Sequence, residues 1–312
     1  MRPIVIAHRG ASGYLPEHTL AAKKLAHEMG ADYLEQDIVA SRDDELIVLH
    51  DVHLDRVTDV AERFPDRARE DGRYYARDFD LDEIRRLRAW ERMNADGSAV
   101  FPGRYAPRSG DFHLHTLAEE LALVAQLNAG TNRQAGVYPE IKRPAWHQAE
   151  GIDIAPILLR VLADYGYTER EDPVFVQCFD PAEIERLRNE LNCPFKLVQL
   201  IGENSWREAD TDFDAMRTKQ GLAQIAKVAD AIGPHIEQMY AMHSDDEGIV
   251  PSDLCQWAHS VGLTVHPYTF RLDELPPGFT SFDQLVSFFV AEVGVDGLFT
   301  DFPDKVLQLR FP

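Results

Sequence analysis

The chain has 312 residues and a formal net charge of -21, from 32 Lys and Arg against 53 Asp and Glu. This acidity excludes a binder of the DNA or RNA backbone, which needs a positive surface, and disfavours attachment to anionic membranes. The sequence contains no run of 18 apolar residues, so no membrane-spanning helix is expected. Its three cysteines are too few for a disulfide scaffold.

Short apolar runs rich in β-branched residues alternate along the chain with segments of helical periodicity. This alternation is typical of repeated β–α units and a parallel sheet. The expected strands are residues 3–8, 33–39, 137–141, 174–177, 196–201, 231–233, 263–268 and 297–300. The expected helices include residues 19–29, 117–128, 154–165, 182–191, 252–260 and 282–293. Eight strands with helices between them predict an α/β fold of the (β/α)8 TIM-barrel type, with a doubly wound open sheet as the alternative.

One region interrupts this alternation. Residues 46–50 form a further expected strand only six residues after the preceding one, which is too close for a helical crossover. The polar residues 42–44 indicate a turn, so this strand is expected to return as a β-hairpin. Residues 51–111 are polar and poorly periodic, and we expect an inserted capping subdomain within a single catalytic domain of residues 1–312. The acidic run 244–248 is expected to be a solvated loop.

Acidic side chains stand near the ends of two expected strands. Glu35 and Asp37 are two residues apart on one strand and therefore point to the same face, and Glu140 lies on the neighbouring strand. The C-terminal ends of TIM-barrel strands carry the active site, where partly buried carboxylates repel one another unless a cation or proton compensates. Three carboxylates without Cys or imidazole partners favour Ca²⁺ or Mg²⁺. Simple pairing with Arg9 or Lys142 is the alternative.

Two histidines are expected at the same end of the barrel. His8 ends the first strand, and the hairpin places His50 roughly opposite Asp37. A single histidine at a strand end is more often structural, but a pair flanking one centre can act as general base and general acid. Arg9 and Lys142 suit a phosphate or carboxylate, or neutralise the acidic residues. Together these residues predict metal-assisted phosphoryl chemistry.

Several longer segments are similar to a known family. They are residues 4–19, 33–37, 48–51, 63–69, 138–142, 176–180, 265–269 and 296–304. On these segments the chain resembles glycerophosphodiester phosphodiesterases over nearly its whole length, and most closely their bacterial periplasmic, calcium-dependent branch. The resemblance implies a (β/α)8 barrel with a small inserted subdomain. It also implies hydrolysis of a glycerophosphodiester to glycerol 3-phosphate and an alcohol, through a cyclic phosphate.

By motif position, the resemblance implies a role for each candidate residue. The acid and base catalysts, in either order, are His8 and His50. The ligands of Ca²⁺, with Mg²⁺ as the alternative, are Glu35, Asp37 and Glu140. The substrate-binding residues are Arg9 and Lys142 on the phosphate, and His266, Tyr268 and Phe299 on the glycerol or alcohol side. Core packing is the competing interpretation of Phe299, and His18 stands where many members have Asn.

The resemblance also implies a periplasmic location, whereas the first residues show no signal peptide, so a cytoplasmic location is the alternative. The expected partner is a small-molecule glycerophosphodiester, without nucleic acid or a membrane span, and a homodimer is left open. A related barrel phospholipase would need an apolar membrane-facing rim, which the hydrophilic insertion does not suggest. A non-catalytic calcium-binding surface protein on the same barrel is the other alternative, against which the two histidines argue.

Overall fold

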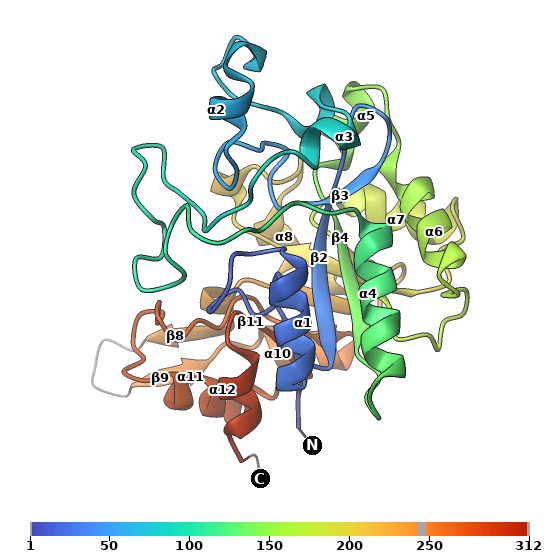
Figure 1. The fold of residues 1–312 in the computed structure, drawn as a ribbon. Helices are drawn as coiled ribbons and strands as arrows, with labels where there is room; N and C mark the ends of the chain where they lie inside the picture. The colour runs from blue at the N-terminus through green and yellow to red at the C-terminus, as the bar shows by residue number, and fades with distance from the viewer. Residues whose placement is uncertain (1, 243–247, 311–312) are drawn as a thin grey trace.

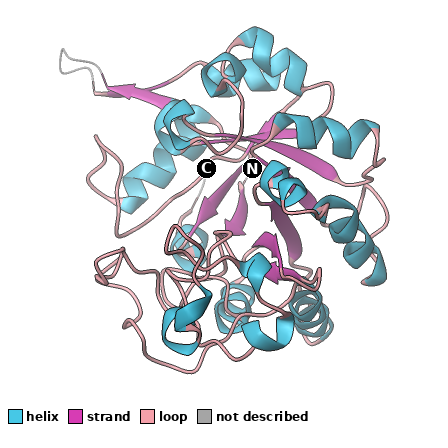
Figure 2. Ribbon diagram, turned by 90° about the horizontal axis from the view of Figure 1, so that it is seen from above, coloured by secondary structure: helices cyan, strands magenta, loops and turns pink. Residues whose placement is uncertain are grey.

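The computed structural model describes residues 2–242 and 248–310, so most of the acidic run 244–248 lies outside the described residues. Eight parallel strands form a nearly closed barrel (Figures 1 and 2). In chain order they are β1 (Ile4–Ala7), β2 (Tyr33–Ala40), β4 (Gly136–Ile141), β5 (Phe175–Cys178), β6 (Lys196–Ile201), β7 (Ala231–Pro234), β10 (Thr264–Val265) and β11 (Gly297–Thr300). The predicted TIM-barrel fold is confirmed, and these strands fall on the eight expected apolar runs.

The barrel closes between β10 and β11, which lie at the two ends of the strand order. The amide of Asp296 donates to the carbonyl of Val265, and the amide of Phe299 donates to the carbonyl of Pro267, both at 3.0 Å. β10 covers only two of the residues expected as a strand over 263–268. Hydrogen bonds to β7 nevertheless continue past β10, from the amides of His266 and Tyr268 to the carbonyls of Ile232 and Pro234.

Helices cover the outside of the barrel (Figure 2). The six expected helices are α1 (Leu20–Met29), α4 (Leu117–Ala129), α6 (Ile154–Asp164), α7 (Pro181–Asn189), α10 (Leu254–Ser260) and α11 (Phe282–Phe288), the last continued by a π-helix over Phe289–Val293. Elements that the sequence pattern misses are α5 (Pro144–Ala149), α8 (Phe213–Met216), α9 (Lys219–Ile225), α12 (Pro303–Gln308) and the hairpin of β8 (Tyr240–Met242) and β9 (Ile249–Pro251). These are too short for a period to show. None of the described helices has the length and hydrophobicity needed to cross a membrane.

Capping residues fix the ends of the two helices that flank β2. The Thr19 hydroxyl accepts from the amide of Ala22 at 3.2 Å, and α1 ends at Gly30, whose φ of 99° suits glycine. At the start of α4, Thr116 accepts from the amide of Glu119, whose carboxylate accepts from the amide of Thr116 in return. This reciprocal pair is a capping box.

The strand β3 (Leu46–Val48) returns antiparallel to β2, as predicted, with Val48 paired to Ile38. The amide of Leu49 donates to the carbonyl of Asp37 at 2.9 Å. Leu49, and not His50, therefore lies opposite Asp37, so the expected register is wrong by one residue. The turn contains Asp44 in the left-handed conformation, with φ 64°. Such a residue lengthens a hairpin loop by one position, and the composition of the turn does not reveal this extra position.

Residues 51–111, which we call the insert, contain two single-turn helices, α2 (Val60–Arg63) and α3 (Leu81–Ile84). Their apolar side chains pack with Ile47 and Leu49 of the hairpin in a hydrophobic cluster separate from that around the barrel. The insert lies at the end of the barrel opposite to the one near which the chain termini lie (Figure 1). It therefore lies at the end where the parallel strands finish.

Candidate active site

The C-terminal ends of the barrel strands surround a cavity of about 570 Å³. Most of the residues predicted for the site line this cavity, namely His8, Arg9, Glu35, Asp37, His50, Glu140, Lys142, Tyr268 and Phe299. They lie on β2, β4 and β11 or closely follow β1, β3, β4 and β10. The fold therefore brings residues from both ends of the chain to one place, as the strand-end positions predict.

His266 is the exception. Its side chain is 1% exposed, and its Nδ1 lies 2.8 Å from the hydroxyl of Tyr138 inside the barrel, where the ring packs against Phe175. His266 therefore does not line the cavity that the other predicted residues share. Strand alternation predicts that this side chain points inward, but not that it lies below the cavity in the packed interior. Phe299 packs on Tyr138, as the core interpretation expects, and it also lines the cavity, so its contact with substrate stays a prediction.

The three predicted metal ligands are buried, and each already has a partner. Glu35 Oε2 accepts from the backbone amide of Arg9 at 2.6 Å, and Glu140 Oε1 lies 2.7 Å from Lys142 Nζ. Asp37 Oδ2 lies 3.5 Å from Arg9 Nε. The alternative of neutralisation by Arg9 and Lys142 is therefore real, although it leaves two cations against three carboxylates.

The electrostatics of these carboxylates show the imbalance. Burial and the nearby charge of Asp37 raise the pKa of Glu35 well above its usual range. Burial raises the pKa of Glu140 to about 8; Lys142 acts to lower this pKa, and the charge of Asp37 acts to raise it. The pKa of Asp37 is well below its usual range because Lys142 and His50 favour the charged form over the effect of burial. Two of the three carboxyl groups thus hold their protons more tightly than free carboxyl groups do, as expected where buried carboxylates lack a compensating cation.

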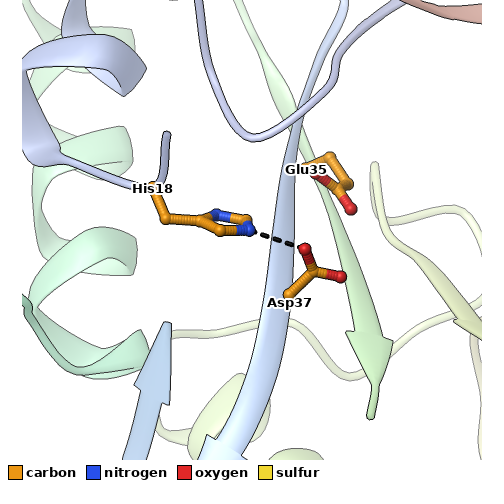
Figure 3. Close-up of side chains that lie close together, drawn as sticks. All are labelled: His18, Glu35 and Asp37. Carbon is orange, nitrogen blue, oxygen red and sulfur yellow. Dashed lines mark hydrogen bonds and ion pairs between the residues drawn. The ribbon is translucent and has the colours of Figure 1, made fainter. Parts of the chain in front are cut away.

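The donor set fits a hard divalent cation. Asp37 Oδ1 and Gln177 Oε1 are buried without a hydrogen-bond partner among the described residues, so oxygen lone pairs remain for a ligand. His18, Glu35 and Asp37 each offer one ligand atom, and these atoms lie within 4.8 Å of one another (Figure 3). His18 Nε2 is 2.6 Å from Asp37 Oδ2, marked by the dashed line in Figure 3. His18 therefore either orients Asp37 as a hydrogen-bond donor or joins the ligand set.

Arg9 adopts an unusual backbone conformation for a side chain-bearing residue, with φ 59°. This conformation lets its amide donate to Glu35, while its carbonyl accepts from the amide of His18 at 3.0 Å. Its guanidinium donates to Glu17 at 3.0 Å. Backbone strain of this kind persists where the surrounding contacts enforce it, which is common at functional sites.

Each of the two predicted catalytic histidines is hydrogen-bonded to a carboxylate through Nδ1. His8 Nδ1 lies 2.6 Å from Asp301 Oδ1, and His50 Nδ1 lies 2.7 Å from Asp51 Oδ1. Against the effect of burial, Arg271 holds the pKa of Asp301 well below its usual range, and Arg92 does the same for Asp51. Both carboxylates are therefore ionised and accept the hydrogen bond from their histidine. The Nδ1 atoms therefore donate, which leaves the Nε2 lone pair of each neutral ring available.

Both imidazoles are neutral near pH 7. Burial, aided by Arg9, lowers the pKa of His8 to about 4, against the opposing effect of Asp301. Burial, with Arg9 and Lys142, lowers the pKa of His50 to about 3. A neutral imidazole is the form that accepts a proton, and a bound anion between the two rings would favour the protonated form of one of them.

The opposite wall of the cavity is aromatic. It is lined by Phe179, Trp206, His235 and Tyr268. The ring centroids are 5.9 Å apart for Phe179 and Tyr268, 5.8 Å for Tyr268 and His235, and 5.0 Å for His235 and Trp206. Lys142 Nζ lies 5.7 Å from the ring centroid of Phe179. The cavity therefore has a charged side near the barrel strands and an apolar side that can receive the carbon skeleton of a ligand.

The family model described as Glycerophosphoryl diester phosphodiesterase family matches residues 8–305 of the chain. The chain belongs to this family. A glycerophosphodiester phosphodiesterase of Haemophilus influenzae is 41% identical over 323 residues, covering 98% of this chain and 89% of that protein. One of Treponema pallidum is 37% identical over 319 residues, covering 96% of this chain and 90% of that protein.

Solved structures of similar fold belong to proteins with related names. A putative glycerophosphoryl diester phosphodiesterase from Silicibacter pomeroyi superposes with a TM-score of 0.71 at 23% identity, covering 98% of this chain and 92% of that chain. An Oleispira antarctica phosphodiesterase, solved in complex with the product sn-glycerol-3-phosphate, gives 0.63 at 20% identity, covering 98% and 96%. At these identities the structures support the barrel fold.

In this member of the glycerophosphoryl diester phosphodiesterase family, several residues contact the site although the sequence assigned them no role there. Glu17, His18, Asp51 and Asp301 lie within the segments that carry the family resemblance, and the signal is their position beside a predicted element. Asp51, for example, directly follows His50. Arg92 and Arg104 lie in the insert, and no sequence pattern singles them out.

Glu91 of the insert is a buried carboxylate whose charge is poorly compensated. Its Oε2 has no hydrogen-bond partner among the described residues, and burial together with Glu17 raises its pKa to about 8. Because the folded state holds this proton more tightly than the unfolded chain, the stabilisation is complete below about pH 4.5 and is lost as the pH rises through 8.

We expect Glu91→Gln to raise the free energy of unfolding by about 1–3 kcal/mol at pH 9 and to change it little at pH 5. Urea unfolding at the two pH values measures the difference. Glu70→Gln, which alters an exposed carboxylate of the same insert, is the control and should stay within about 0.5 kcal/mol at both. Equal effects of Glu91→Gln at pH 5 and pH 9 would contradict the prediction.

Proposed function

We propose that the protein hydrolyses glycerophosphodiesters to glycerol 3-phosphate and an alcohol, with His8 and His50 as the acid and base. The enzyme class, a glycerophosphodiester phosphodiesterase, follows from family membership. The observation that carries the mechanism is the pair of carboxylate-backed imidazoles that line one cavity with three carboxylates and two cations. The family resemblance supports a periplasmic location for this activity, and the position of the insert at the cavity end of the barrel supports a capping role.

Glu35, Asp37 and Glu140 would hold the divalent cation, which we propose to be Ca²⁺, with Mg²⁺ as the alternative. Their oxygen donors, their mutual repulsion and the unpartnered Asp37 Oδ1 support this assignment. When bound, the cation supplies positive charge that stabilises a phosphate as negative charge builds on its oxygens. With a cation bound, Lys142 and Arg9 would no longer be the only charges that neutralise these carboxylates, and both could contact a phosphate.

Arg9 and Lys142 then bind the phosphate. The guanidinium of Arg9 offers paired donors to two phosphate oxygens, whereas the Lys142 ammonium acts as a point charge. Both side chains line the cavity, and each lies beside a predicted metal ligand, Arg9 beside Asp37 and Lys142 beside Glu140. The apolar wall of Phe179 and Tyr268 leaves room for the alcohol side of the diester.

The two imidazoles move the protons. One Nε2 accepts a proton from the attacking hydroxyl, which the family resemblance makes the glycerol 2-hydroxyl, and the oxygen–phosphorus bond of a cyclic phosphate forms. The other imidazole, protonated, gives its proton to the departing alcohol oxygen as the second phosphorus–oxygen bond breaks. Water then opens the ring with the roles exchanged. Asp51 and Asp301 keep the Nδ1 protons in place throughout.

A panel of diesters from glycerophosphocholine to glycerophosphoglycerol tests this function. We expect release of glycerol 3-phosphate with Ca²⁺, a loss of at least about a hundredfold after chelation, and recovery when Ca²⁺ is restored. The His8→Ala protein, purified in the same way, controls for contaminating activity. Failure of every diester to yield glycerol 3-phosphate with either Ca²⁺ or Mg²⁺ would overturn the proposal, and calcium binding without turnover would favour a non-catalytic surface protein.

A further inference from the structure

The carboxylate behind His50 is held by a residue of the insert. Arg92 donates through Nη1 to Asp51 Oδ2 at 2.6 Å, while Asp51 Oδ1 accepts from His50. The same guanidinium donates through Nε and Nη2 to both oxygens of Glu17, at 3.0 Å and 2.6 Å. The side chain of Arg92 is only 10% exposed. A buried arginine with three charge-assisted bonds holds its partners in one geometry.

The carboxylate behind His8 is held in the same way by a second residue of the insert. Arg104 donates through Nη2 to Asp301 Oδ2 at 2.7 Å, while Asp301 Oδ1 accepts from His8. Arg104 also donates to Asp273 and to the carbonyl of Ser12, whose hydroxyl donates to the carbonyl of His8. Its side chain is 4% exposed.

The carboxylates behind the two histidines, Asp51 and Asp301, lie 250 residues apart in the sequence, yet the surroundings of the two histidines repeat one pattern. In each, a histidine donates to a carboxylate whose second oxygen accepts from a buried arginine of the insert. One difference is that Asp301 also accepts from Arg271, a barrel residue, at 2.9 Å, whereas Arg92 is the sole arginine that the described residues place on Asp51.

We propose that Arg92 and Arg104 are positioning residues, through which the insert fixes the orientation and tautomer of His50 and His8. This inference rests on the proposed function, because it gives the insert a part in the catalytic geometry beyond covering the cavity. A carboxylate with one oxygen on arginine and the other on Nδ1 can rotate little, so the proton stays on Nδ1 and Nε2 faces the cavity. Loss of the arginine frees the carboxylate and then the ring.

Kinetics give the first test. Arg92→Gln is expected to lower kcat about 10- to 100-fold, the range typical of groups that orient a catalytic residue. Arg104→Gln should lower kcat less, about three- to tenfold, because Arg271 remains on Asp301, and should leave KM within about twofold. Arg92→Lys and Arg104→Lys, which keep one charged donor, should recover part of the loss.

A double variant tests whether Arg92 acts through Asp51. If it does, the kcat of Asp51→Asn combined with Arg92→Gln stays within about threefold of Asp51→Asn alone. Full multiplication of the two losses would overturn the inference. The control is Arg69→Gln in the same insert, because Arg69 bonds Asp78 and, outside the insert, Glu150, and contacts neither histidine nor its carboxylate. Its kcat should stay within about twofold of wild type.

Histidine nitrogen NMR gives a readout that does not depend on turnover. In the wild type both rings should show the Nδ1-protonated tautomer, with signals assigned through His8→Gln and His50→Gln. Arg92→Gln should populate the other tautomer of His50 alone, and Arg104→Gln that of His8 alone. Unchanged spectra in both variants, or a loss of kcat in Arg69→Gln equal to that in Arg92→Gln, would overturn the inference. If the wild type cleaves no diester, the proposed function fails and the spectra alone decide the positioning role.

Discussion

Replacement of His8 or His50 by alanine is expected to lower kcat for a glycerophosphodiester about 10²- to 10⁴-fold, because each variant lacks one of two proton-transfer groups. The fold should survive, since both side chains line the cavity and their carboxylate partners keep other donors in Arg271, Arg104 and Arg92. Steady-state kinetics with glycerophosphoglycerol measure the loss, and thermal unfolding of each variant checks the fold.

A matched histidine outside the cavity separates a catalytic loss from a general one. His53 lies in the insert, packed at a tilt on Tyr75 with ring centroids 4.4 Å apart, and among the described residues it makes no hydrogen bond to Asp51 or Asp301, the carboxylates behind His50 and His8. His53→Ala should keep kcat within about twofold. Near-normal turnover of both the His8 and the His50 variants would remove the acid–base mechanism, whatever the behaviour of His53.

Glu35→Gln is expected to abolish most of the response of the protein to Ca²⁺. In the wild type, Ca²⁺ at a hundred times its Kd should stabilise the folded state by about 2.7 kcal/mol and raise Tm by several degrees. Glutamine keeps an oxygen for the Arg9 amide but removes a charge whose burial is unfavourable, so the metal-free variant should be at least as stable as the metal-free wild type. Calorimetric titration and Tm with and without Ca²⁺ measure both effects.

Glu183 supplies the control for that experiment. It is a buried carboxylate on α7, bonded to Arg186 and not among the residues that line the cavity, so Glu183→Gln should keep the full Tm response to Ca²⁺. An equal Tm rise in Glu35→Gln and the wild type would show that the carboxylates of β2 do not hold the ion. Full activity of chelator-treated wild type would carry the same conclusion.

The sequence predicts the barrel well because each strand is an apolar, β-branched run and each long helix has a periodic face. It predicts the residues of the cavity almost as well, since parallel strands must finish at the same end and polar residues such as Glu35 and Glu140 are conspicuous there. The failures have physical causes. Alternation gives the direction of His266 but not its depth, and a left-handed Asp44 shifts the hairpin register by one residue.

The roles of Arg92 and Arg104 lie beyond any local pattern. Both belong to a polar segment in which arginine and aspartate alternate with little periodicity, and most of its other arginines form ion pairs nearer the surface. Which arginine reaches a buried carboxylate depends on how the loops of the insert cross the barrel, and that path is set by tertiary packing. Such contacts can therefore be recognised only from the folded structure.

Residue 9 serves the site with two chemically independent parts. Its main chain, held at positive φ, gives the amide of this position to Glu35, whereas its guanidinium, which donates to Glu17, is the part that we propose to bind a phosphate. Glycine would accept that backbone conformation readily and keep the amide donor, but would lack the charge. The amide donor to Glu35 and the positive charge are therefore separable at this single position of the barrel, because the first belongs to the main chain and the second to the side chain.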